Sequence, residues 1–149
     1  ACQASKSIAL DTCELLVGFE PEVKRLSQPV FASLNNLETH YAYFGNEVIT
    51  SSGVIYSVED YQKYLNEESV AYSHAKRSLL DGKPLMVGSM ARLHFFADKL
   101  HPDAANIYRL SALGQGDTNT IWNNFAQAIE VVEAIDRSIE IIDLLLSHD

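Results

Sequence analysis

The sequence predicts a mainly α-helical fold: a helical bundle with a long C-terminal helix and a small β-hairpin or ribbon between helices. Apolar residues recur every three or four positions over most of the chain, which is the spacing of amphipathic helices. The longest such run covers about residues 119–147. β-prone residues gather at Val48-Ile49 and Val54-Ile55-Tyr56, on either side of a turn-forming Thr-Ser-Ser-Gly segment.

Length, composition and charge exclude several classes of protein. A chain of 149 residues with 47% apolar residues has the size and composition of one globular domain. We expect no membrane span, since no apolar run approaches roughly 20 residues, and no signal peptide. The net charge of −9 argues against a nucleic-acid partner. The two cysteines, Cys2 and Cys13, are too few for a disulfide framework and predict a reducing, cytoplasmic compartment.

Two helices are predicted before the hairpin. The first covers residues 5–16 and ends near Gly18, because glycine commonly follows the last turn of a helix. The second covers about residues 23–41, where apolar residues are again spaced by three or four. Pro29 lies inside this second pattern, so either the helix kinks there or Ser27 caps a new helix with the proline in its first turn. We favour the new start at Ser27.

Two further helices are predicted between the hairpin and the C-terminal helix. One runs over residues 57–72 from Ser57, and Asp60 stands three residues later, as in a capping box. The other is short; it begins at the turn His101-Pro102-Asp103 and ends at about Leu113.

The segment from residue 81 to residue 93 differs from its helical surroundings. Asp81-Gly82 is a turn signal, and the apolar run Leu85-Met86-Val87 predicts a short buried strand that can pair with the hairpin strands. Gly88 interrupts this run, and Ser89 is placed to begin a helix that carries Arg92. Just beyond, apolar side chains are expected in the core: Leu93, Phe95 and Phe96.

The C-terminal helix is predicted from a cap at Thr118 or Asn119 to about Ser147, roughly 43 Å for about 29 residues. Its apolar positions alternate spacings of four and three: Ile121, Phe125, Ala128, Val132, Ile135, Ile139, Ile142 and Leu146. Charged residues are expected on the opposite side, with Glu133 and Arg137 spaced for a favourable pair: Glu130, Glu133, Arg137 and Glu140.

Common signatures of catalytic sites are absent from the sequence. There is no Glu-x-x-His, Cys-x-x-Cys or His-Glu-x-x-His. The five histidines are scattered, so we expect surface or hydrogen-bonded side chains rather than metal ligands. A small-molecule site near His74, Lys76 and Arg77 is one interpretation of the local basic group, and a solvated patch is the favoured one.

Several segments, in order, resemble the large subunit of nickel–iron hydrogenases, especially the cytoplasmic kind. The run Cys2–Ala9, followed by Gly18-Phe19-Glu20-Pro21, is similar to the segment that begins at the second cysteine of the family's N-terminal Cys-x-x-Cys pair. A Val-Gly-x-x-Ala-Arg block ends at Arg92. Further similar stretches bring the resemblance to nearly the whole chain, from Cys2 to Leu145: Gly53–Tyr61, Tyr72–Lys76 and Ala126–Glu130.

The resemblance implies an oxidoreductase that interconverts dihydrogen with protons and electrons at a nickel–iron centre. It further implies a hetero-oligomer with an iron–sulfur small subunit. Cys2 matches the cysteine that bridges nickel and iron in the family, and thiolate suits such soft metals. No catalytic residue and no other cofactor-binding residue is assigned. Lys76 and Arg92 lie in similar segments, but packing and salt bridging are their expected roles.

Departures from the family pattern limit the expected activity. The family's usual histidine four residues after the cysteine is Lys6 here, and both the first cysteine of the pair and the C-terminal Asp-Pro-Cys-x-x-Cys are missing. We therefore expect residues 1–149 to form a single domain, a fragment or truncated relative of a larger large subunit, which is inactive alone. A non-catalytic, acidic helical interaction module is the alternative, since the apolar stripe of the C-terminal helix exceeds what a small domain covers.

Overall fold

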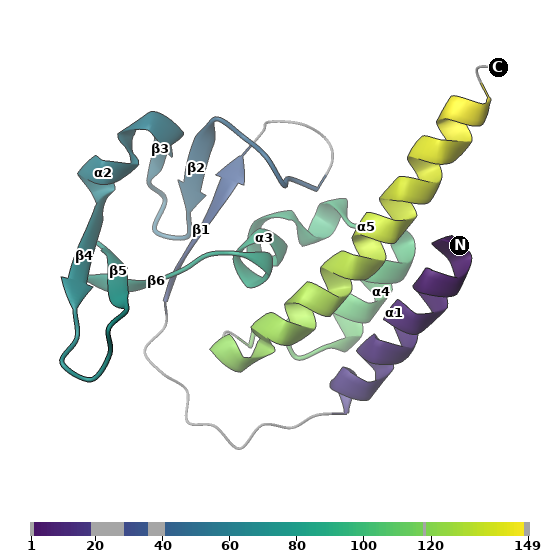
Figure 1. Ribbon diagram of the computed structural model, residues 1–149, viewed down its shortest axis with the longest axis horizontal. Helices are drawn as coiled ribbons and strands as arrows, with labels where there is room; N and C mark the ends of the chain where they lie inside the picture. The colour runs from purple at the N-terminus through teal and green to yellow at the C-terminus, as the bar shows by residue number, and fades with distance from the viewer. Residues whose placement is uncertain (1, 19–28, 36–40, 118, 148–149) are drawn as a thin grey trace. The chain divides into compact units, whose positions relative to one another are not determined.

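The computed structural model describes residues 2–18, 29–35, 41–117 and 119–147, which form two compact units (Figure 1). The helical unit draws on Ala1–Val23 and Ala97–Asp149, and the sheet unit on Lys24–Phe96. Three predictions fall outside the described residues in whole or in part: Thr118 as a cap, Ser27 as a helix start, and positions 23–28 and 36–40 of the helix predicted over residues 23–41.

The sheet unit contains a six-stranded mixed sheet in the order β3-β2-β1-β6-β5-β4. β1 and β6 are parallel, and every other neighbouring pair is antiparallel. The strands are β1 (Val30–Asn35), β2 (Glu47–Thr50), β3 (Ile55–Ser57), β4 (Leu65–Ser69), β5 (Lys76–Leu80) and β6 (Lys83–Met86).

The predicted fold class, a mainly α-helical bundle with a small hairpin, is wrong, because the chain is an α/β protein. β1 occupies the middle of the helix predicted over residues 23–41. Val30 and Leu34 are four residues apart, which fits a helix, yet Val30, Phe31, Ala32 and Ser33 are all buried. Four consecutive buried residues are typical of a central strand that is covered on both faces, and an amphipathic helix would expose one of them.

The predicted hairpin is present as β2 and β3. Val48 lies opposite Tyr56, and Ile49 lies opposite Ile55. The predicted ribbon is nevertheless part of a larger structure, since β2 also pairs with β1. This extension matters because an isolated two-stranded ribbon is marginally stable in water.

The helix predicted over residues 57–72 ends at Tyr64. A 3-10 turn (Val58–Asp60) leads into a single helical turn, α2 (Tyr61–Tyr64), and β4 follows directly. Ser57 does cap this start, since its Oγ accepts a hydrogen bond from the Glu59 amide at 3.3 Å. Beyond Tyr64 the pairing of β4 with β5 replaces the helix, with Leu65 opposite Leu80.

The turn and the helix predicted within residues 81–93 are present, but the predicted strand is not buried. It ends at Met86, Val87 is 57% exposed, and it pairs with β1 and β5 instead of the hairpin strands β2 and β3. Asp81 and Gly82 form the turn with positive φ angles of 50° and 73°, a conformation that glycine adopts without strain. β6 follows, and α3 (Ser89–Phe96) begins at the predicted serine. α3 packs on β1, where the His94 ring stacks on Phe31 at 4.7 Å between centroids. Of the three expected core residues, Leu93 and Phe96 are buried, whereas Phe95 is half-buried.

The helical unit contains the predicted helices at both ends of the chain. Its helices are α1 (Cys2–Val17), α4 (Pro102–Leu110) and α5 (Asn123–Leu146), with 3-10 turns at Ala97–Lys99 and Thr120–Trp122. α1 and α5 lie side by side and antiparallel (Figure 1). Their shared core includes Cys13 of α1 and, on α5, Phe125, Ile129 and Val132. Asn119 caps the C-terminal element, because its side chain accepts a hydrogen bond from the Ile121 amide.

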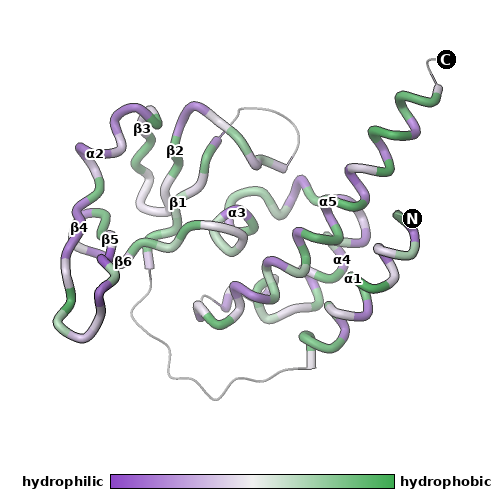
Figure 2. The backbone as a smooth tube through the Cα atoms, in the orientation of Figure 1, coloured by the Kyte–Doolittle hydropathy of each residue, from purple (hydrophilic) through white to green (hydrophobic). Residues whose placement is uncertain are grey.

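The buried and exposed faces of α5 differ from those that the sequence predicted. Glu130 and Glu133, expected to face solvent, are buried. The apolar stripe is buried only in the first half of the helix. Hydrophobic positions continue toward the end of α5 (Figure 2), and there these large apolar side chains are exposed: Ile141, Ile142, Leu144, Leu145 and Leu146. Among the described residues, no helix combines the length and apolar character needed to cross a membrane.

Candidate functional site

Cys2, the predicted metal ligand, is the first residue of α1. It is a free thiol with intermediate exposure. The other cysteine, Cys13, lies in the core of the helical unit at 1% exposure, and burial raises the pKa of its thiol. Buried, protonated thiols are poor ligands, so Cys2 is the cysteine with access to a metal.

The described residues do not complete a nickel–iron centre. Among them, no three His, Cys, Asp or Glu side chains gather closely enough to hold a metal ion. A centre of soft metals requires several thiolates, and the chain supplies Cys2 alone from an accessible position. If Cys2 binds such a centre, the remaining ligands must therefore come from residues outside the described part of the chain.

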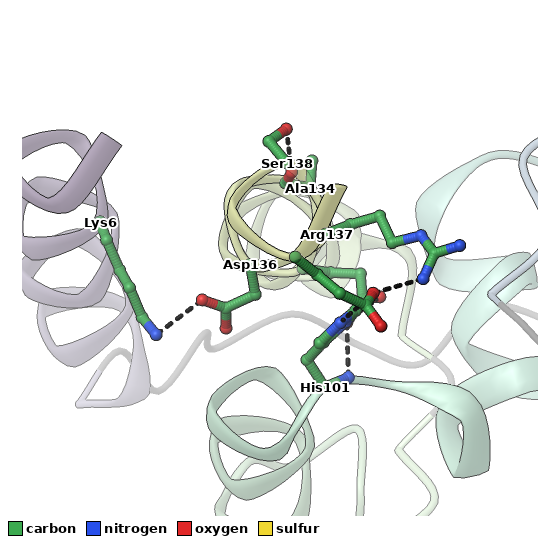
Figure 3. A network of polar contacts seen from close by, with 8 residues as sticks. Lys6, His101, Ala134, Asp136, Arg137 and Ser138 are labelled. Carbon is green, nitrogen blue, oxygen red and sulfur yellow. Dashed lines mark hydrogen bonds and ion pairs between the residues drawn. The ribbon is translucent and has the colours of Figure 1, made fainter. Parts of the chain in front are cut away.

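Lys6, one turn after Cys2, connects α1 to both neighbouring helices. Its Nζ lies 2.6 Å from a carboxylate oxygen of Asp136 on α5 (Figure 3). The same Nζ lies 2.6 Å from a carboxylate oxygen of Asp103 on α4. The hydrogen bonds donated to Asp103 and then to Asp136 raise the pKa of Lys6. The residue at the position where the resemblance predicts histidine thus holds the three helices together.

The Lys6–Asp136 pair also sets where Cys2 lies along α5. Because α1 and α5 are antiparallel, the residue one turn before Lys6 is level with a part of α5 beyond Asp136. Cys2, the first residue of α1, therefore lies at the same end of the helical unit as the exposed apolar residues near the end of α5. Figure 1 shows that α1 and α5 run antiparallel, so that the start of α1 and the end of α5 are at the same end of this unit.

His101 joins α4 to α5 through two glutamates (Figure 3). Its Nδ1 is 2.8 Å from Oε1 of Glu133, and its backbone amide donates to Oε2 of the same side chain at 2.7 Å. Its Nε2 is 3.3 Å from Glu140, which also pairs with Arg137. Burial lowers the pKa of His101, but Glu133 and then Glu140 outweigh this, so the pKa lies above its usual value.

This network corrects one prediction and confirms another. Glu133 does not pair with Arg137 as its spacing predicted; it is 2% exposed and bonds to His101 instead. His101 is the hydrogen-bonded histidine that was expected. The pairing itself has no sequence signal, because the partners are 32 residues apart.

The basic group on the β4–β5 hairpin has a structural explanation. Lys76 lies 2.8 Å from Glu67, and Arg77 pairs with Glu68, in both cases across the two strands. His74 is exposed near the tip of the hairpin. These cross-strand pairs favour the solvated patch over a small-molecule site.

Comparison with proteins of known name relates the chain to hydrogenase subunits. It is 36% identical over 107 residues to the sulfhydrogenase 1 subunit alpha of Pyrococcus furiosus, which covers 72% of this chain and 25% of that subunit. It is 33% identical over 84 residues to the sulfhydrogenase 2 subunit alpha of the same organism, covering 56% of this chain and 20% of that subunit. No protein-family model matches the chain.

These matches support a relationship to hydrogenase large (alpha) subunits over part of the chain. The chain spans about a quarter or less of the length of the curated relatives that it matches.

Proposed function

We propose that this chain is a section of a nickel–iron hydrogenase large subunit that supplies one metal ligand, Cys2, to a centre completed by other residues. The observation that carries the proposal is the 36% identity to a sulfhydrogenase alpha subunit over 72% of the chain. The whole protein would be an oxidoreductase that interconverts dihydrogen with protons and electrons. The 149 residues alone, with one accessible thiolate, are expected to be inactive.

The position of Cys2 supports this role. It begins a helix that is fixed by the ion pairs of Lys6, so the thiol has a defined place at one end of the helical unit. The exposed apolar residues of α5 lie at that same end. A further large-subunit segment or an iron–sulfur small subunit that covers them would come close to Cys2. We propose such a hetero-oligomer, and a cytoplasmic location consistent with two free thiols.

The test is the metal content and activity of the natural gene product, purified from its host under anaerobic, reducing conditions. We expect stoichiometric nickel and iron and hydrogen-dependent dye reduction by the complex. Cys2→Ser should reduce both to background, while Cys13→Ser, which changes the buried thiol, should retain both. Bound metal and full activity in the Cys2→Ser protein would overturn the role of Cys2. A natural product without nickel, or dye reduction by the 149 residues alone, would overturn the proposal itself.

A second candidate function is a non-catalytic, acidic interaction module. The observation that favours it is the exposed end of α5, where Leu144, Leu145 and Leu146 are 58%, 65% and 69% exposed. Apolar surface of this kind is typical of helices that bind a partner. Binding of an apolar dye to this end of α5, together with a metal-free natural product, would favour this function.

A further inference from the structure

α1 and α5 enclose an apolar groove of about 380 Å³ in the helical unit. None of the described residues that line it is ionic, although the chain has a net charge of −9. They include Ile8 and Thr12 of α1, and Ala128, Val131 and Ile135 of α5. The groove is open, since Ile8 and Val131 are 67% and 50% exposed.

The α5 residues of this groove belong to a heptad pattern that continues to the end of the helix. The α5 seam, as we call it, alternates spacings of three and four: Ala128, Val131, Ile135, Ser138, Ile142 and Leu145. This is the spacing of coiled-coil contact positions, at which side chains of one helix fit between those of another. The seam has no ionic residue along its length.

The two halves of the α5 seam have different surroundings. The first half, up to Ile135, lies in the groove beside α1. Lys6 of α1 is level with Asp136 and the helices are antiparallel, so Ile142 and Leu145 lie beyond the part of α5 that α1 covers. Each chain therefore presents an apolar groove and, further along the same helix, a projecting apolar end.

The hydroxyl groups on this face are bonded within their own helices. Oγ of Ser138 donates a hydrogen bond to the Ala134 carbonyl at 2.7 Å, on the side of α5 turned away from His101 (Figure 3). Oγ1 of Thr12 donates in the same way to the Ile8 carbonyl at 2.8 Å. Covering this face with apolar side chains therefore leaves neither hydroxyl without a partner.

The α5 seam is complementary to itself in the antiparallel direction. A two-fold axis between positions 135 and 138 sets Ala128 opposite Leu145 of a second copy, Val131 opposite Ile142, and Ile135 opposite Ser138. The small side chains Ala128 and Ser138 thus meet larger ones, and the projecting end of each α5 meets the groove of the other copy. One groove and one end per chain make the contact closed at two copies.

We propose that a second copy of this chain docks on the α5 seam, and that the end of each α5 fills the groove between α1 and α5 of the other copy. Two copies that each carry a charge of −9 repel one another least where the contact face is uncharged. The inference goes beyond the proposed function, since it involves neither Cys2 nor a metal. Ile141 and Leu146 lie outside the α5 seam, where another subunit of the proposed hetero-oligomer can contact them.

The test is sedimentation equilibrium of the full 149-residue chain at a series of concentrations. We expect a reversible equilibrium between monomer and dimer. Val131→Lys and Ile142→Glu should each weaken the dimer about tenfold or more, because each places an unpaired charge in an apolar contact. Both positions are part-exposed in the single chain, so the fold should tolerate them, which circular dichroism checks. Leu110→Lys, at an equally exposed apolar position on α4, should leave the dimer unchanged.

The double variant Val131→Lys, Ile142→Glu identifies the occupant. Positions 131 and 142 face each other only between two antiparallel copies, so the introduced charges should pair and restore the dimer to within a few-fold of its original strength. High salt should weaken this restored dimer. A chain that is monomeric at every concentration, single variants that dimerise like the unsubstituted chain, or a double variant no stronger than the single ones would overturn the proposal.

Discussion

At the scale of single residues, His101 provides a pH-dependent connection between α4 and α5. Glu133 and Glu140 raise its pKa above the usual value of about 6.5. The protonated imidazole is therefore more stable in the folded chain than in the unfolded chain. This stabilisation is fully present below the unfolded-state pKa and declines as pH rises through the higher folded-state pKa.

We predict that His101→Gln lowers the free energy of unfolding by about 1–2 kcal/mol near pH 6, as expected for hydrogen bonds to charged groups. The difference from the unsubstituted chain should become smaller as the pH is raised from 6 through the folded-state pKa of His101, because the charge on the imidazole is then lost while its contact with Glu133 is retained. Thermal unfolding monitored by circular dichroism over this pH range measures the difference. His74→Gln, at an exposed hairpin position, is the matched control, and an equal effect of both substitutions would contradict the prediction.

At the scale of elements, Gly45 allows the chain that leads into β2 to lie against the end of β1. A Cβ atom at this position would lie 2.3 Å from the Asn35 carbonyl oxygen and 2.5 Å from its carbon. Both are backbone atoms of a paired strand, so neither can move without disturbing the sheet.

We predict that Gly45→Ala destabilises the chain by about 1–3 kcal/mol, the usual cost of overpacking. Chemical denaturation with linear extrapolation provides the measurement. Gly18→Ala is the control, because no atom lies within 4 Å of a Cβ at Gly18. If both variants unfold at the same denaturant concentration, the close approach at Gly45 is not significant for stability.

The elements that could be predicted are those with a strong local signal. The β2–β3 hairpin, the Asp81-Gly82 turn and α5 each combine periodicity with turn or cap residues. β1 and β4 have no such signal, because β1 is buried on both faces and β4 is polar and largely exposed. What makes them strands is pairing with distant neighbours, as β1 does with β6.

The residues of the candidate site also divide into those that a local sequence pattern predicts and those that only long-range contacts bring together. The local pattern predicted a helix over residues 5–16, and only the structure shows that this helix begins at Cys2. The partners of Lys6 and His101 do not, because Asp103, Asp136 and Glu133 come close only when α1, α4 and α5 pack. Arg92 could be singled out by its segment, but its place in a cavity depends on the register of strands far apart in sequence.

At the scale of the whole molecule, the two units carry different kinds of evidence about function. The helical unit contains Cys2 and the exposed end of α5, the features on which a role within a larger assembly depends. The sheet unit contains the cavity that Arg92 lines, and all of the described lining residues belong to that unit. We therefore expect an assembly partner to bind the helical unit.

The exposed end of α5 leads to a prediction about the apolar surface that the chain presents to a dye, with little effect on its stability. Replacing both Leu145 and Leu146 by serine should reduce the fluorescence of a bound apolar dye markedly, because the two side chains are 65% and 69% exposed. The unfolding free energy should change by no more than about 1 kcal/mol, as expected for two surface substitutions. Leu110→Ser, at 66% exposure on α4, controls for the loss of exposed apolar area elsewhere. If the double variant and the unsubstituted chain bind equal amounts of dye, and both sediment as monomers, this end of α5 is not the surface that a partner covers.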